Sequence, residues 1–217
     1  MQEDNEPDEI TRHIARHIGK PLDMAIHEII GLLRIQVVPA SAERAHQTLI
    51  TTGMSEYSMT APAGCDDYRH IELFMHLPAR WPLDKNAWKD LNTFWPIEWM
   101  RLIAHYPESS PVFLASQQTI GSTPVEPFAP NTGLSSMMLL ETPDELPSLR
   151  LADGRLVRFY QLIPLYEEER VFKERNGTKA LFDLFDEYKI SQVIDPKRRN
   201  VAPNQRMQTS GVPPSDP

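Results

Sequence analysis

Apolar and polar residues recur along the chain with two different periods, one typical of strands and one of helices. Short apolar or β-branched runs predict strands at residues 33–38, 47–52, 71–77, 112–120 and 134–141. The third of these follows His70, and its apolar side chains occupy every second position. His70 and Glu72 therefore share the face opposite Ile71, which we interpret as a polar or partner-facing pair.

Helical spacing is found at both ends of the chain and in its middle. Ile10, Ile14 and Ile18 lie four apart and predict a helix over residues 8–18. Residues 85–94 and 97–106 predict two short helices, with Pro96 in the first turn of the second. Two more helices, residues 167–175 and 178–188, are expected on either side of Asn176-Gly177.

These elements predict a mixed α+β fold. Asp153-Gly154 lies between two apolar arms and is a strong β-hairpin signal, because both residues tolerate positive φ. A mixed, largely antiparallel sheet flanked by helices accounts for this order of elements. We expect residues 1–20 to form a charged leader helix, residues 21–201 a single domain, and residues 202–217 a disordered tail.

Charge and composition narrow the range of functions. The chain has 217 residues and a net charge of -8, which disfavours nucleic acid and favours a basic protein partner. The N-terminus lacks the pattern of a secretory signal, and no apolar run approaches the length of a membrane span. We therefore expect a cytoplasmic protein that binds neither membranes nor nucleic acid.

Two pairs of residues raise the possibility of metal chemistry. His13 and His17 have the i, i+4 spacing of zinc ligands on a helix, but the glutamate of the zincin pattern is missing, so a solvated helix face is the preferred interpretation. His70 and Glu72 imitate the His-x-Glu of zinc deaminases, but the matching cysteine motif is absent. We expect no catalytic residues, no metal and no cofactor. A metal-dependent hydrolase that uses His70 and Glu72 remains an alternative.

Several segments, taken in order, resemble the Suppressor of fused domain family, especially its bacterial single-domain members. The most specific are Thr51-Thr52-Gly53-Met54-Ser55 and Pro164-Leu165-Tyr166-Glu167-Glu168-Glu169, with weaker matches at Arg69-His70-Ile71-Glu72-Leu73, Trp81-Pro82-Leu83 and Asp195-Pro196. The resemblance covers residues 20 to 201. It implies a mixed α/β domain that binds other proteins without catalysis, and bacterial members are often immunity proteins of toxin systems.

This resemblance leads to an expected function and an expected surface. The chain is expected to be an immunity or antitoxin-type protein that sequesters a toxin or effector protein; a scaffold that holds a transcription factor is the alternative. Gly53 can end its strand sharply and project the residues that follow it. The expected partner-binding residues are Met54, Glu56, Tyr57, His70 and Glu72. A purely structural turn with Met54 buried is an equally open interpretation.

Overall fold

A computed structural model of the chain describes residues 7–22, 25–27 and 32–203. Its centre is an 8-stranded sheet in which seven strands follow the order β1-β2-β3-β4-β8-β6-β5, while β7 pairs with β8 outside this path. The strands are β1 Ala25–His27, β2 Arg34–Val38, β3 His46–Thr52, β4 His70–Pro78, β5 Thr119–Gly121, β6 Leu134–Glu141, β7 Leu149–Arg150 and β8 Leu156–Tyr166. Within the described residues, every strand pairing is antiparallel except β4 with β8. The predicted mixed, largely antiparallel sheet is confirmed.

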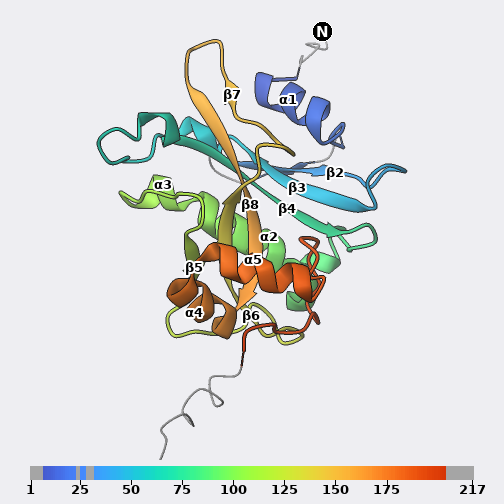
Figure 1. Cartoon of the computed structure of the whole chain (residues 1–217). Coiled ribbons are helices and arrows are strands. Elements are labelled where there is room, and N and C mark those ends of the chain that lie inside the picture. Colours follow the sequence, from blue (N-terminus) through green and yellow to red (C-terminus); the bar gives the residue numbers. More distant parts are fainter. Residues whose placement is uncertain (1–6, 23–24, 28–31, 204–217) are drawn as a thin grey trace, which may run out of the picture.

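The helices are distributed over both faces of this sheet (Figure 1). They are α1 Glu9–His17, α2 Leu91–Ala104, α3 Tyr106–Ser109, α4 Glu167–Asn176 and α5 Thr178–Glu187, with 3₁₀ turns η1 Met54–Glu56, η2 Asp66–Tyr68 and η3 Ala87–Lys89. The predicted helices at the two ends of the chain are present. Gly177, with φ of 89°, separates α4 from α5, as expected.

Two predictions in the middle of the chain were wrong. Residues 85–106 form the short turn η3 and one long helix, α2, which continues through Pro96. Proline has no N–H to donate to the carbonyl of Asn92, four residues earlier. The side-chain amide of Asn131 donates to that carbonyl at 3.2 Å instead, so the helix continues without an orphaned acceptor. The strand predicted at residues 112–120 is reduced to β5.

Three clusters of buried apolar side chains hold the layers together. The largest lies between one face of the sheet and α2, and it contains Trp95 and Leu73. Leu73 and Phe74 are neighbours on β4 and therefore point to opposite faces, so Phe74 belongs to a second cluster with α1. The third cluster packs α5 against β6 and β8 through Met138, Ile163 and Phe185. Helices thus cover both faces of the sheet.

Coverage of both faces explains why β4 is buried along nearly its whole length. The alternation in its sequence is an alternation between two cores, and residues Ile71 to Leu77 are all buried. The interpretation of Glu72 as a surface residue was wrong for this reason. The expectation of a solvated face for His13 was wrong as well, since this side chain is buried and its Nε2 lies 2.7 Å from the carbonyl oxygen of Pro147.

The predicted leader is the helix α1, which packs on the sheet through Ile10 and Ile14. Asp8 caps it by accepting a hydrogen bond from the amide of Thr11 at 2.7 Å. Residues 204–217, most of the predicted tail, lie outside the described residues. Of the helices in the described part of the chain, none is long and apolar enough to cross a membrane.

Candidate protein-binding site

The turn that follows β3 is built on Gly53. This residue has φ of 94°, which side-chain-bearing residues rarely adopt, and a Cβ placed here would lie 2.2 Å from the carbonyl oxygen of Leu32. The glycine lets the chain leave the strand and pass closely beside Leu32 before it enters η1. The expectation of a sharp strand end at Gly53 is confirmed.

The buried carboxylate of Glu72 holds this turn in place. Its Oε1 accepts hydrogen bonds from the Gly53 amide (3.0 Å), the Ser55 amide (3.0 Å) and the Ser55 hydroxyl (2.7 Å). Its Oε2 accepts one from the hydroxyl of Thr51 at 2.6 Å. Burial raises the pKa of Glu72, while these donated hydrogen bonds act in the opposite direction. The carboxylate therefore serves as an internal anchor for residues 51–55.

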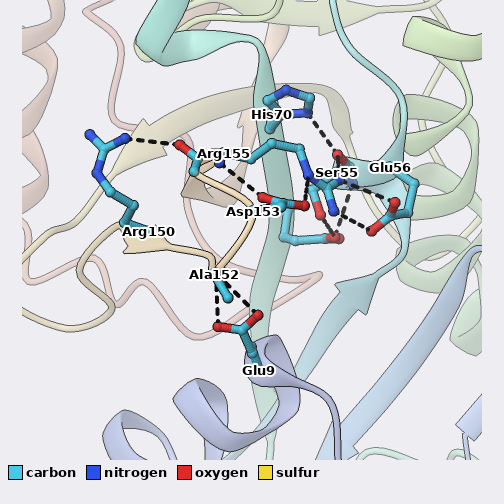
Figure 2. A network of polar contacts seen from close by, with 10 residues as sticks. Glu9, Ser55, Glu56, His70, Arg150, Ala152, Asp153 and Arg155 are labelled. Carbon is cyan, nitrogen blue, oxygen red and sulfur yellow. Dashed lines mark hydrogen bonds and ion pairs between the residues drawn. The ribbon is translucent and has the colours of Figure 1, made fainter.

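A second set of contacts joins the turn to the β7–β8 hairpin (Figure 2). The guanidinium of Arg155 donates to the carbonyl of Ser55 at 3.2 Å and forms an ion pair with Glu56 at 3.1 Å. It also contacts Asp153, with 2.7 Å between Nε and Oδ2. His70 approaches the same carbonyl from β4, with 2.8 Å between its Nδ1 and the Ser55 oxygen. The turn after β3 and the turn of the β7–β8 hairpin, about 100 residues apart in sequence, therefore form one polar surface.

The helix α1 closes this surface on a third side. The carboxylate of Glu9 accepts hydrogen bonds from the amide of Ala152 at 3.2 and 3.3 Å (Figure 2). Between α1, the end of β3 and the β7–β8 hairpin lies an open pocket of about 430 Å³. Its charged lining consists of four carboxylates and two guanidinium groups, from Asp8, Glu9, Glu56, Asp153, Arg34 and Arg155. The charged groups of the pocket therefore carry, on balance, a negative charge.

The structure divides the five sequence-predicted binding residues into two groups. Met54 and Glu72 are buried, with 1% and 0% of their surface exposed, so the expectation that they face a partner is corrected. Met54 packs in the main core, and Glu72 is surrounded by the donors of the turn. Glu56 is exposed, whereas Tyr57 and His70 are half-buried. Glu56 alone among the five also lines the pocket.

Sequence reasoning missed Arg155 and Asp153 as members of this surface. The Asp153-Gly154 turn itself was predicted, but nothing in the local pattern indicates that the hairpin folds back onto residues 55 and 56. His70 and Glu72, the pair of the alternative hydrolase interpretation, have a different role. Both oxygens of Glu72 accept hydrogen bonds from the turn, and His70 contacts a backbone carbonyl rather than Glu72. The pair therefore supports the turn and does not form a joint acid–base site.

The fold and the pocket define a class: a mixed α+β domain with a charged surface pocket assembled from four separate segments. The profile of the Suppressor of fused protein family matches residues 24–199. The chain belongs to this family.

Solved structures share the fold at low sequence identity. A suppressor of fused homologue from Neisseria gonorrhoeae is 17% identical, with a TM-score of 0.57 over 88% of this chain and 93% of its own. A chain of the Sufu–Fu complex is 14% identical, with a TM-score of 0.61 over 88% and 90% of the two chains. Drosophila Suppressor of Fused is 13% identical with a TM-score of 0.57, over 84% of this chain and 46% of its own length.

A curated relative is an uncharacterized protein of Ureaplasma parvum serovar 3. The two are 26% identical over 132 residues, which is 59% of this chain and 61% of the relative. The chain therefore matches less than two thirds of the length of this relative.

Proposed function

We propose that this protein is a non-catalytic binding module that sequesters a toxin or effector protein in the cytoplasm, as an immunity protein does. Membership of a family of protein-binding regulators supports a protein partner. The observation that carries the proposal of a binding surface is the pocket between α1, the end of β3 and the β7–β8 hairpin.

The chemistry of the pocket favours a basic segment of the partner. Carboxylates outnumber guanidinium groups in its lining, and the whole chain carries a net charge of -8. Opposite charge at such a surface raises the association rate and disfavours acidic competitors such as nucleic acid. Exposed Leu32, which also lines the pocket, adds an apolar contact beside the charges.

The site is preorganised, which reduces the entropic cost of binding. Glu72 holds the turn on one side through four hydrogen bonds, and Arg155 joins that turn to the hairpin on the other. Neither the turn after β3 nor the hairpin turn therefore has to become ordered when the partner binds. A scaffold that holds a transcription factor would use the same surface, so the identity of the partner decides between the two proposals.

The experiment begins with tagged protein purified from its native cells, with bound proteins identified by mass spectrometry. The purified partner is then titrated against wild-type protein and against the charge-reversed variant Glu56→Lys/Asp153→Lys. The matched control, Asp186→Lys/Glu187→Lys, makes the same charge change on α5, which lies away from α1 and β7 (Figure 1). Circular dichroism and urea midpoints verify that both variants are folded.

The outcomes separate the two parts of the proposal. We expect the pocket variant to lose at least about tenfold in affinity, equivalent to about 1.4 kcal/mol, and the control to bind as wild type does. Equal binding by the two variants would exclude this pocket. Failure of the wild-type protein to retain any stoichiometric protein partner would contradict the function itself. A partner that is toxic alone and harmless when coexpressed with this protein would support the immunity role.

A further inference from the structure

Three side chains from distant parts of the sequence converge away from the pocket. They are His46 at the start of β3, His76 near the end of β4, and Glu145 in the connection between β6 and β7. One ring nitrogen of each histidine and one oxygen of the carboxylate all lie within 4.8 Å of one another. Neither residues 46–76 nor the wider sequence shows a recognised metal-binding motif, so only the fold reveals this cluster.

The hydrogen bonds of His76 orient its ring. Its Nδ1 lies 3.1 Å from the hydroxyl oxygen of Thr48, and its Nε2 lies 2.9 Å from Oε1 of Glu145. Because Nε2 lies 2.9 Å from a carboxylate oxygen, Nε2–H donates to Glu145 in the metal-free protein. A metal ion would replace this proton at Nε2, while Nδ1–H donates to the Thr48 hydroxyl, which has two acceptor lone pairs. An outer hydrogen bond of this kind is the usual support of a metal-ligating histidine.

The surroundings of the His46 ring are not explained by a structural ion pair between His76 and Glu145 alone. Its ring lies 4.3 Å from that of His76, and its Nε2 is buried without a hydrogen-bond partner among the described residues. A buried polar atom without a partner is costly, and a bound cation would satisfy it. The cluster therefore has an unused ligand atom next to an oriented imidazole and a carboxylate.

We propose that His46, His76 and Glu145 form a binding site for a divalent transition metal ion, with zinc as the preferred ion. Two imidazoles and one carboxylate are a ligand set that zinc accepts, with a fourth position left for water. Zinc–ligand bonds of about 2.0–2.2 Å in a tetrahedral site place the ligand atoms roughly 3.3–3.5 Å apart. Nε2 of His76 and Oε1 of Glu145, now 2.9 Å apart, would separate slightly, and the His46 nitrogen, now within 4.8 Å of both, would move closer. Thr48 would orient His76 as its outer partner.

The electrostatics of the cluster suit a cation despite one opposing charge. The half-buried ring of His46 presents an imidazole nitrogen, which ligates zinc in its neutral form. Glu145 supplies a carboxylate, whose negative charge attracts a divalent cation. Arg44 opposes the cation, although its guanidinium donates elsewhere, to the Thr48 hydroxyl and the Pro39 carbonyl at 2.6 Å.

A metal ion here would fasten the connection between β6 and β7 to the sheet. Its ligands come from residues 46, 76 and 145, so binding closes long loops of the unfolded chain and stabilises the folded state. The site is separate from the proposed binding pocket, since none of its ligands lines that pocket. Its test is therefore independent of the proposed function.

The experiment uses untagged full-length protein, so that no polyhistidine competes. Apoprotein is titrated with ZnCl₂ by calorimetry, bound zinc is counted by mass spectrometry after dialysis, and Tm is recorded with and without zinc. The site variants are His46→Gln and Glu145→Gln, which keep side-chain volume and polarity. The control His70→Gln removes another imidazole of β4 and also tests the alternative pair His70 and Glu72.

We expect one zinc ion per chain with a Kd below about 1 µM, and a loss of about 10- to 100-fold in each site variant. Zinc at 100 times Kd should raise the Tm of the wild type and of His70→Gln by about 5 °C or more, and that of the site variants by much less. Absence of stoichiometric zinc in the wild type would overturn the proposal. Unchanged affinity in both site variants, or loss of binding in His70→Gln alone, would overturn it as well.

Discussion

Removal of the Glu72 carboxylate should destabilise the protein more than any exposed substitution, because the turn after β3 depends on it. The variant Glu72→Ala removes the acceptor of four hydrogen bonds. The hydroxyl of Thr51 has another acceptor, the carbonyl of Leu73 at 3.4 Å. The amide of Gly53 and both donors of Ser55 have no other acceptor among the described contacts.

The magnitude follows from these three orphaned donors. Each buried donor left without an acceptor costs about 1–3 kcal/mol, and the cavity left by the side chain adds to that cost. Relief from burying a carboxylate, together with water entering the space, offsets part of it. We expect a net loss of about 3–5 kcal/mol for Glu72→Ala. Glu72→Gln keeps one oxygen for the three donors and should lose about 1–2 kcal/mol.

Urea unfolding followed by tryptophan fluorescence measures these losses as differences in the free energy of unfolding. The exposed substitutions Glu187→Ala and Glu187→Gln on α5 provide a matched control and should change stability by less than about 0.5 kcal/mol. Equal stability of Glu72→Ala and Glu72→Gln would refute the reasoning, because it would mean that the converging donors do not need the remaining oxygen.

Other contacts lead to three further predictions. Gly53→Ala should lose at least about 2–3 kcal/mol in the same urea assay, because φ is 94° and the added Cβ meets the Leu32 carbonyl at 2.2 Å; wild-type stability would contradict this geometry. Arg198 donates to the buried carboxylate of Glu169 at 2.5 and 2.7 Å. Arg198→Met leaves this carboxylate without its guanidinium partner and should lower the free energy of unfolding by about 3–5 kcal/mol; a loss below about 1 kcal/mol would show that the ion pair is not needed. The folded-state pKa of His46 is about 4, below its ordinary value of 6.5, so the unfolded chain takes up this proton first as pH falls. The contribution of neutral His46 to the free energy of unfolding is therefore fully present above pH 6.5 and is lost as pH falls toward 4. The loss should be about 1–2 kcal/mol, after allowance for partial exposure of the ring. Urea midpoints of metal-free protein should therefore change less between pH 6.5 and 4 in His46→Gln than in the wild type. The same pH dependence of the midpoint in both proteins would exclude His46 as the origin of this loss of stability.

Local patterns were sufficient where neighbouring residues decide the outcome. Asp153-Gly154 predicted its hairpin and Asn176-Gly177 predicted a helix break, because backbone preference acts within a few residues. Pro96 was misinterpreted because its missing hydrogen bond is replaced by Asn131, which lies 39 residues away. Local propensity gave no sign of that compensation.

The sequence by itself determined the family, the class of fold and most of the strands and helices, since these depend on hydrophobic period, turn residues and ordered motifs. Only the tertiary structure decided which polar residues are available to a partner. His70 and Glu72 look equivalent on an alternating strand, but the turn after β3 folds over Glu72 and buries it, while His70 stays half-buried. The pocket and the cluster of His46, His76 and Glu145 also arise from contacts between distant segments. Such contacts depend on strand pairing and helix packing, and no local pattern of residues encodes them.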